Sequence, residues 1–307
     1  MPGWHEVETR RLYPELMVSM GEPDAAEVKP DAGLYQIAEE EFSMIRCRQL
    51  AAVISMTLVT LAWAGGMADA AQCGNGPGGF ENWKRAFSEE ARAKGIGVTA
   101  LGALMQANYA SATIAADRSQ HSFSLSLEAF MAKRGAATIV SRGRGLKRSQ
   151  AALFASIEQR YGVPPGPLIA IWGMETGFGR ERGNQNMLSS IATLAYDCRR
   201  PEFFTDQLYA ALKLIDRGSV SPSQRGSMHG EVGQTQFMPK NVLAYGVGNL
   251  DVAANALSST ANFLKAHGWR AGAGYQPGEP NFAAIEAWNG AQVYQKAIAI
   301  MGRQIDG

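Results

Sequence analysis

Apolar residues recur every three or four positions along most of the chain beyond residue 80. Phe80, Trp83, Phe87 and Ala91 show this spacing, which places apolar side chains on one face of a helix, and Gly95 ends the pattern. Runs of alternating apolar and polar residues, which would indicate strands, are scarce. Further helices are predicted at 101–109, capped by Thr99, and at 122–131, 153–161, 166–178, 186–197, 202–216, 250–267 and 290–303. The pattern therefore predicts a mainly α-helical protein.

Glycine and proline interrupt this pattern in two places. Residues 71–79 include a Gly/Pro-rich stretch and are predicted to form a linker. Arg142–Gly145 alternates arginine with glycine and is predicted to break the helical pattern. No internal repeat divides the remainder, so residues 80–307 are interpreted as one helical region.

The longest apolar run, from Ala51 to Trp63, is shorter than the roughly 18 residues that a membrane span needs. A short basic stretch precedes it, and the small-x-small triplet Ala68-Asp69-Ala70 follows it. This order is typical of a secretory signal peptide, here over residues 44–70. Because an export signal works best at a terminus, residues 1–43 are interpreted as an upstream extension from a mistaken start. The alternative is a buried core helix.

Export would leave two of the three cysteines, Cys73 and Cys198, in the mature chain, because Cys47 leaves with the signal. Two cysteines in an oxidising compartment are candidates for a disulfide. Sequence alone leaves the bond open, since it does not show whether the two Cα atoms approach. Lipid attachment at Cys73 is not favoured, because Gln72 precedes it where a small residue is required. The protein is therefore expected to be periplasmic and without a lipid anchor, and a membrane-tethered form is the alternative.

The composition and charge of the chain argue against several classes of function. The chain has 307 residues, 19% of them charged, with a formal net charge of +1. Near-neutral charge gives no support for a nucleic-acid partner. Three cysteines without a Cys-x-x-Cys pair indicate neither a disulfide-rich scaffold nor structural zinc. No metal or cofactor is expected.

One carboxylate stands inside the apolar segment Leu168–Gly179. Ile171 and Trp172 lie about one helical turn before Glu175, and Phe178 lies three residues after it. Apolar surroundings disfavour the ionised form and raise the pKa of a carboxyl group towards the range that suits a general acid. The alternative is that Glu175 faces solvent at a helix end and has no chemical role.

Polar groups suited to sugars gather in the segment 226–239. Gln234–Gln236 offers neutral donors and acceptors of the kind that recognise sugar hydroxyls and acetamides. The alternative is a polar loop that only connects helices. A third group near the C-terminus comprises Trp288, Asn289 and Tyr294. Taken singly, its two aromatic residues would more often belong to a core than to a site.

Together these segments resemble the catalytic domain of lytic murein transglycosylases of the membrane-bound B type. The similarity runs from about Phe80 to Gly307 and rests on ordered blocks, of which any one alone is a weak signal. The blocks are Tyr161–Pro165 with Trp172–Gly179, Ala192–Tyr196 with Arg199–Phe204, Gly226–Ser227 through Gln234–Pro239, Ala261–Trp269, and Asn281–Phe282 through Trp288–Asn289 to Tyr294.

The resemblance implies a lysozyme-like α fold, with a core at about 147–307 and an added N-terminal helical region. It implies cleavage of the β-1,4 bond between N-acetylmuramic acid and N-acetylglucosamine, with Glu175 as the sole catalytic acid and base. Glu175 would protonate the glycosidic oxygen and then accept a proton as the muramoyl 6-hydroxyl attacks, giving a 1,6-anhydro product. The substrate's acetamide would stabilise the positive intermediate.

The same resemblance implies roles for the surrounding residues. It makes peptidoglycan glycan strands the substrate and cell-wall synthesis or remodelling proteins candidate partners. Ser227 and Asn289 would orient Glu175 or the acetamide. Arg199 and Arg200 would meet lactyl or peptide carboxylates. The sugar cleft would be lined by Gln236, Phe237 and Tyr294.

The chain also departs from the family pattern. Glu231 stands where relatives usually carry alanine. It could be a surface residue without a role, or its charge could raise the pKa of Glu175. A third alternative is that it is the second carboxylate of a muramidase-type hydrolase. Tyr245–Asp251 lacks the alternating oxygen ligands of a calcium loop. A short stretch after Trp269 indicates a missing insertion, and Trp288 replaces a common tyrosine. A catalytically idle glycan-binding scaffold remains the alternative to an enzyme.

Overall fold

The computed structural model describes residues 71–119 and 125–307. The predicted signal peptide and upstream extension, residues 1–70, lie outside the described residues. The mainly α-helical prediction is confirmed, since regular structure in the described ranges is helical apart from one short antiparallel strand pair. In chain order the elements are η1 (Pro77–Gly79), α3 (Phe80–Ala93), α4 (Val98–Met105), α5 (Ser111–Arg118), α6 (Leu127–Lys133), α7 (Ala136–Ser149), α8 (Ala151–Tyr161), α9 (Pro165–Thr176), β1 (Gln185–Asn186), α10 (Met187–Tyr196), α11 (Pro201–Asp216), β2 (Arg225–Gly226), α12 (Pro239–Tyr245), α13 (Ala253–Ala266), α14 (Phe282–Trp288) and α15 (Gln292–Asp306).

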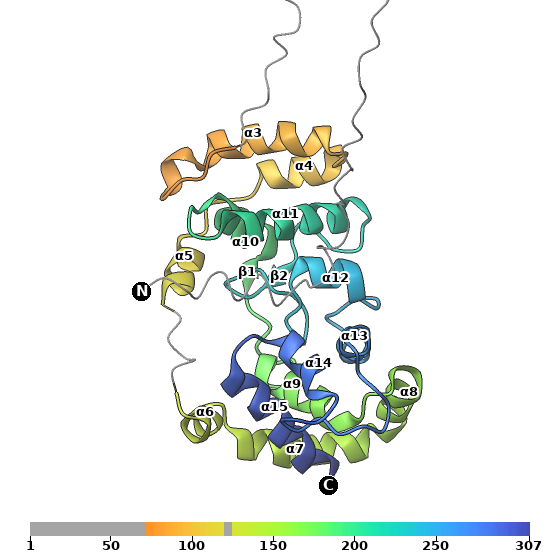
Figure 1. Ribbon diagram of the computed structural model, residues 1–307. Helices are drawn as coiled ribbons and strands as arrows, with labels where there is room; N and C mark the ends of the chain where they lie inside the picture. Colours follow the sequence, from red (N-terminus) through yellow and green to blue (C-terminus); the bar gives the residue numbers. More distant parts are fainter. Residues whose placement is uncertain (1–70, 120–124) are drawn as a thin grey trace, which may run out of the picture. The chain divides into compact units, whose positions relative to one another are not determined.

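Helix α9 is the central helix of the core. Pro165 occupies its first turn, where the missing N–H is not needed, and every residue from there to Met174 is buried. A helix that is apolar all round must be covered on all sides, and α7 and α15 pack against α9 (Figure 1). Gly166 permits the closest approach, because a Cβ atom there would lie 2.2 Å from the carbonyl oxygen of Gly302.

Helix α7 corrects the prediction that Arg142–Gly145 breaks the helical pattern. The helix runs unbroken from Ala136 to Ser149. A Cβ atom on Gly143 would lie 2.7 Å from Ile169 of α9 and 2.9 Å from Ile305 of α15. Glycine therefore serves close helix packing here, and tertiary contacts offset its weak helix propensity.

The N-terminal helices α3 and α4 pack against α10 and α11 (Figure 1). The prediction that Thr99 caps α4 is wrong, because the helix begins at Val98 with Gly97 as its N-cap residue. The capping carboxylate comes instead from Asp216 at the end of α11, which accepts hydrogen bonds from the N–H groups of Gly97 (2.6 Å) and Ala100 (3.0 Å). A distant side chain thus satisfies donors that local sequence leaves open.

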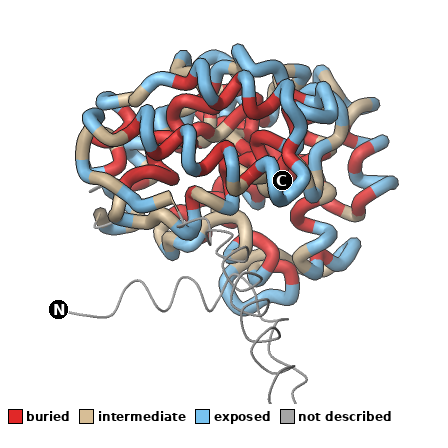
Figure 2. Tube along the Cα trace, turned by 90° about the horizontal axis from the view of Figure 1, so that it is seen from above, coloured by how far each residue is buried: buried red, intermediate tan, exposed pale blue. Residues whose placement is uncertain are grey.

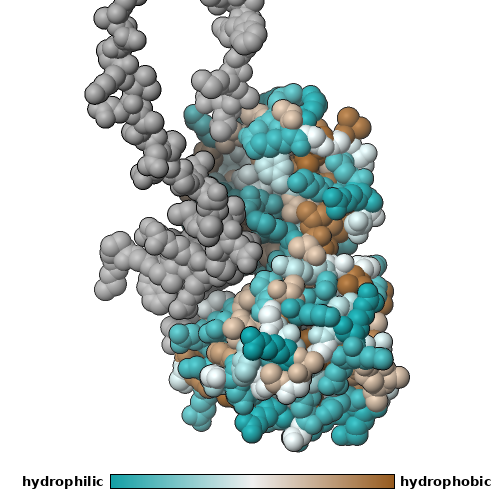
Figure 3. Space-filling model, turned by 45° about the vertical axis from the view of Figure 1, so that its right-hand side comes forward, coloured by the Kyte–Doolittle hydropathy of each residue, from teal (hydrophilic) through white to brown (hydrophobic). Residues whose placement is uncertain are grey.

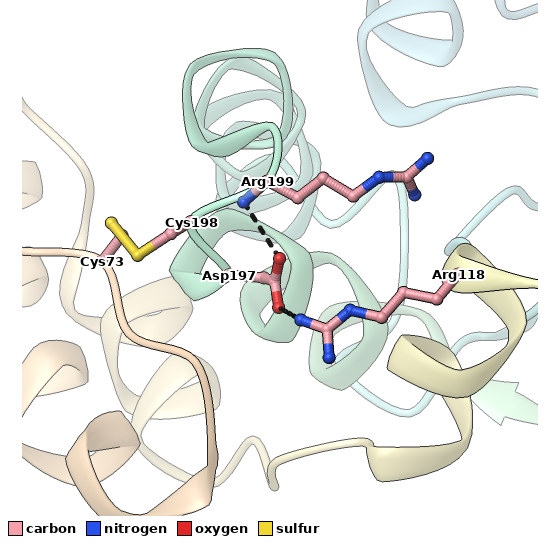
Figure 4. Close-up of a disulfide and its surroundings, with 5 residues drawn as sticks. All are labelled: Cys73, Arg118, Asp197, Cys198 and Arg199. Atoms are coloured by element: carbon pink, nitrogen blue, oxygen red, sulfur yellow. Dashed lines mark hydrogen bonds and ion pairs between the residues drawn. A yellow bond between two sulfur atoms is a disulfide. The ribbon is translucent and has the colours of Figure 1, made fainter.

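The segment 71–79, which the sequence predicts to be a linker, is attached to the helical region by a disulfide and a backbone hydrogen bond. Cys73 and Cys198 are joined in a disulfide, with Cα atoms 5.0 Å apart (Figure 4). The N–H of Gly74 donates to the carbonyl of Tyr196 at 2.9 Å. Next to the disulfide, Asp197 accepts hydrogen bonds from the guanidinium of Arg118 (2.7 Å) and the backbone N–H of Arg199 (3.0 Å) (Figure 4).

Other predicted helices are present with shifted ends, and the structure adds some that the pattern missed. The helix predicted at 122–131 begins at Leu127, where the Ser126 side chain caps it. Helices α5, α7, α12 and α14 were not predicted. Buried residues follow the inward sides of the helices (Figure 2), and on the face shown in Figure 3 hydrophobic residues form small separate areas. Within the described ranges, no helix combines the length and apolarity needed to cross a bilayer.

Candidate active site

Glu175 lies in the last turn of α9 and is half-buried, whereas every residue of the helix before it is buried. Its neighbour Gly177 adopts a left-handed conformation (φ 56°) and ends the helix, as glycine permits. The hydroxyl of Tyr294 donates to Oε1 of Glu175 at 2.5 Å, and the indole Nε1 of Trp288 donates to the same oxygen at 3.3 Å. Both donors come from the C-terminal region, which packs against α9.

The environment raises the pKa of Glu175 to about 7, and loss of hydration is the largest cause. The negative charge of Glu231 acts in the same direction. Donation from Tyr294 and Trp288 and the positive charge of Arg134 oppose the shift, because each favours the ionised form. A pKa near neutrality lets Glu175 give and take a proton under physiological conditions. The expected effect of apolar surroundings on this carboxyl group therefore agrees with the structure.

Ser227 and Glu231 belong to one tight turn, and the charge of Glu231 acts on Glu175. The Ser227 hydroxyl donates to Oε2 of Glu231 at 2.7 Å. The backbone N–H of Ser227 also donates to the Glu231 carbonyl at 2.9 Å, which closes the turn. Burial raises the pKa of Glu231, while the Ser227 hydrogen bond and His229 lower it. In this structure the Ser227 hydroxyl therefore donates its hydrogen bond to Glu231 and not to Glu175.

No hydrogen bond to Glu175 comes from Gln236, Phe237 or Asn289 in the described structure. Gln236 has a left-handed backbone (φ 54°), and its side chain donates to the carbonyl of Gly233 at 2.8 Å. Phe237 is 1% exposed and packs edge-on behind Trp288, so it supports the site and offers no surface to a sugar, contrary to the expectation that it lines the cleft. The side chain of Asn289 accepts from the N–H of Ala291 at 3.0 Å and positions the start of α15.

Gln234 connects the end of α9 to the polar loop. Its side-chain oxygen accepts from Nε1 of Trp172 at 2.9 Å, and its carbonyl accepts from the Thr176 hydroxyl at 2.6 Å. Its amide nitrogen donates to the carbonyl of Asp251 at 2.8 Å. Gln234 is thus engaged within the protein, whereas the sequence suggested a sugar-binding role.

Arg199 and Arg200 form an ion cluster around Asp117 of α5. Both guanidinium groups bind the Asp117 carboxylate, which is buried, and Nε2 of His229 lies 3.7 Å from it. The paired arginines hold the pKa of Asp117 below its usual range despite burial. The two arginines are therefore occupied by a protein carboxylate, a partner that the sequence did not indicate.

Two contacts at the site were not predicted from the sequence. Trp288, which the sequence named as a candidate, donates to the carboxylate of Glu175. Arg134, an exposed residue after α6, lies with its guanidinium carbon 6.0 Å from the ring centroid of Tyr294. Neither contact has a local sequence signal, because both join segments that are distant along the chain. In the part of the chain that the structure describes, no three His, Cys, Asp or Glu side chains cluster as a metal site would require.

Comparisons with known proteins define the class to which this fold and site belong. Residues 79–278 match the family described as "Transglycosylase SLT domain". The match covers more than half of the chain, and the chain therefore belongs to this family. The resemblance found in the sequence is confirmed.

Particular relatives are similar over different extents. Membrane-bound lytic murein transglycosylase B of Escherichia coli is 37% identical over 139 residues, which is 40% of this chain and 38% of that protein. The structure of SltB3 from Pseudomonas aeruginosa in complex with NAG-anhNAM-pentapeptide is 28% identical, with a TM-score of 0.69 over 74% of this chain and 80% of that one. The Escherichia coli lytic transglycosylase SLT35 shares the fold, at 23% identity and a TM-score of 0.65 over 78% of this chain and 97% of that one.

Proposed function

We propose that this protein is a peptidoglycan lytic transglycosylase that cleaves the β-1,4 bond between N-acetylmuramic acid and N-acetylglucosamine without hydrolysis. The observation that carries the proposal is Glu175, a carboxyl group with a pKa of about 7 at the end of the central helix of a transglycosylase domain. SltB3 has been solved with NAG-NAM-pentapeptide and NAG-anhNAM-pentapeptide, which supports the same class of substrate here.

In the proposed reaction Glu175 begins protonated. It gives its proton to the glycosidic oxygen as the acetamide carbonyl oxygen of the muramoyl sugar attacks the anomeric carbon and the glycosidic bond breaks. The resulting carboxylate accepts hydrogen bonds from Tyr294 and Trp288, which stabilise its charge. It then takes the proton of the muramoyl 6-hydroxyl, whose oxygen attacks the anomeric carbon and displaces the acetamide. The product is a 1,6-anhydro sugar, and Glu175 is protonated again.

The predicted signal peptide and periplasmic location would suit an enzyme that works outside the cytoplasm. A disulfide between Cys73 and Cys198 supports an oxidising compartment. We therefore propose export by a signal peptide at 44–70, a periplasmic location, and a catalytic domain at 80–307. The ion pairs of Arg199 and Arg200 with Asp117 would have to open or be shared for those arginines to meet a substrate carboxylate.

The direct test is mass spectrometry of the products released from purified peptidoglycan by the purified protein. We expect muropeptides that end in 1,6-anhydromuramic acid, which are one water lighter than reducing-end products. Reducing-end muramic acid would contradict the proposal and identify a hydrolase, for which Glu231 is the available second carboxylate. Glycan binding without any released product would identify a scaffold.

Tyr294→Phe is expected to shift the alkaline side of the pH–rate profile upwards. The Tyr294 hydroxyl stabilises ionised Glu175, so its loss raises the pKa of that carboxyl group. Because the first step needs protonated Glu175, activity would persist to a pH about one unit higher, as one hydrogen bond to a charged group implies.

Tyr275→Phe is the matched control for this profile. The Tyr275 hydroxyl donates to Asp306 at 2.7 Å and has no contact with Glu175. The control should keep the wild-type profile of kcat against pH. An unchanged profile in Tyr294→Phe would show that this hydroxyl does not act on the catalytic proton.

A further inference from the structure

The Ser227 hydroxyl has no hydrogen-bonding capacity left for a substrate. It donates its single proton to Oε2 of Glu231, and its oxygen accepts from the backbone N–H groups of His229 (3.1 Å) and Glu231 (3.2 Å). A hydroxyl has one donor and two acceptor positions, so all three are used within the turn. The family resemblance implies that this serine orients the acetamide or Glu175. With all three positions used, the Ser227 hydroxyl has none left for either role.

Glu231, unlike Ser227, has a polar atom that is not used within the turn. One carboxylate oxygen is held by the Ser227 hydroxyl, and the other accepts no hydrogen bond from the described residues. Glu231 is half-buried, so part of its side chain remains accessible. Its charge acts on both Glu175 and Tyr294.

We propose that Glu231 accepts a hydrogen bond from the acetamide N–H of the muramoyl sugar whose glycosidic bond breaks, and so stabilises the cationic oxazolinium ring formed there. This inference rests on the proposed function and names a second carboxylate for it. As the acetamide oxygen bonds to the anomeric carbon, positive charge develops over the C–N unit. A carboxylate at the N–H orients the attacking oxygen and stabilises that charge, which exists only after the bond begins to break.

The charged groups around the turn suit different roles for Glu175 and Glu231. Burial raises the pKa of Glu231, and the Ser227 hydroxyl and His229 oppose this shift by favouring its ionised form. His229 in turn lies beside Asp117, which Arg199 and Arg200 bind. The Glu231 charge favours protonated Glu175, against the donors Tyr294 and Trp288 and the cation Arg134. In this proposal Glu175 holds the proton that goes to the leaving oxygen, and the Glu231 carboxylate stabilises the oxazolinium cation.

The test compares Glu231→Gln with the wild type in turnover and in binding of the thiazoline derived from N-acetylglucosamine, a stable mimic of the oxazolinium ring. Glutamine keeps an acceptor oxygen and removes the charge. We expect kcat on peptidoglycan to fall about 100-fold with little change in KM, and the thiazoline to bind at least tenfold more weakly. Binding of plain N-acetylglucosamine should change by less than twofold. Glu158→Gln, on an exposed face of α8, is the matched control and should match the wild type.

Ser227→Ala provides a second variant that keeps the Glu231 charge. If Ser227 acts through Glu231, its loss weakens thiazoline binding about threefold in the wild-type background and has no further effect on Glu231→Gln. Equal thiazoline affinity in the wild type and Glu231→Gln would overturn the inference, even where both variants are slow. A wild type that releases no anhydro product would contradict the proposed function instead, and the thiazoline comparison would still measure whether Glu231 meets the cationic ring.

Discussion

Glu175→Gln is expected to lower turnover of peptidoglycan by about 1,000-fold or more while glycan binding stays within about twofold of the wild type. The proposed reaction uses this one side chain first as acid and then as base, and a positioned acid–base group contributes about 100- to 10,000-fold to a rate. Glutamine preserves the size of the side chain and an oxygen that can accept from Tyr294 and Trp288. The fold of α9 should therefore persist, and the loss should appear in kcat.

The measurement combines product release, followed by mass spectrometry, with binding of soluble glycan strands. Glu158→Gln makes the same chemical change on an exposed face of α8 and should leave both readings at the wild-type level. Digestion by Glu175→Gln at the wild-type rate would show that another group supplies the proton. In that case Glu231, the other carboxylate whose charge acts on the site, would be the next candidate.

The central helix and its carboxyl group could be predicted because their signals are local. A continuous apolar run with proline at its start and glycine at its end specifies a buried helix, and α9 has these features. The same apolar neighbours implied a raised pKa for Glu175, in agreement with the value of about 7. Helix propensity failed at Gly143, because the close packing that favours glycine comes from Ile169 and Ile305.

The partners of polar side chains could not be predicted, because tertiary structure chooses them. Arg199 and Arg200 carry the charge that suits a substrate carboxylate, yet Asp117 of α5 satisfies them within the protein. Ser227 matches a family position, yet its hydroxyl donates a hydrogen bond to the glutamate four residues later. Residue type thus predicted the chemistry of each group, and the fold decided which partner each group meets.

Replacing Cys73 and Cys198 by serine is expected to destabilise the protein by about 3–5 kcal/mol. The bond links residues with a sequence separation of 125, and cross-linking a loop of this length removes much of the freedom of the unfolded chain. Cys73 is exposed, so its replacement leaves no cavity in the core and the loss comes mainly from the unfolded state. For a domain of this size the melting temperature should fall by about 10 °C.

Thermal melting and thiol titration together decide this prediction. Denatured but unreduced wild type should show no free thiol from Cys73 or Cys198, and reduction should lower its melting temperature to that of the double variant. The reductant should leave the double variant unchanged. Because Gly74 also bonds to the Tyr196 carbonyl, the segment 71–79 would keep one attachment without the disulfide. Activity well below the melting temperature is therefore expected to survive, which separates a stabilising bond from one that the site requires. Equal melting temperatures for oxidised wild type and the double variant would show that this attachment alone suffices.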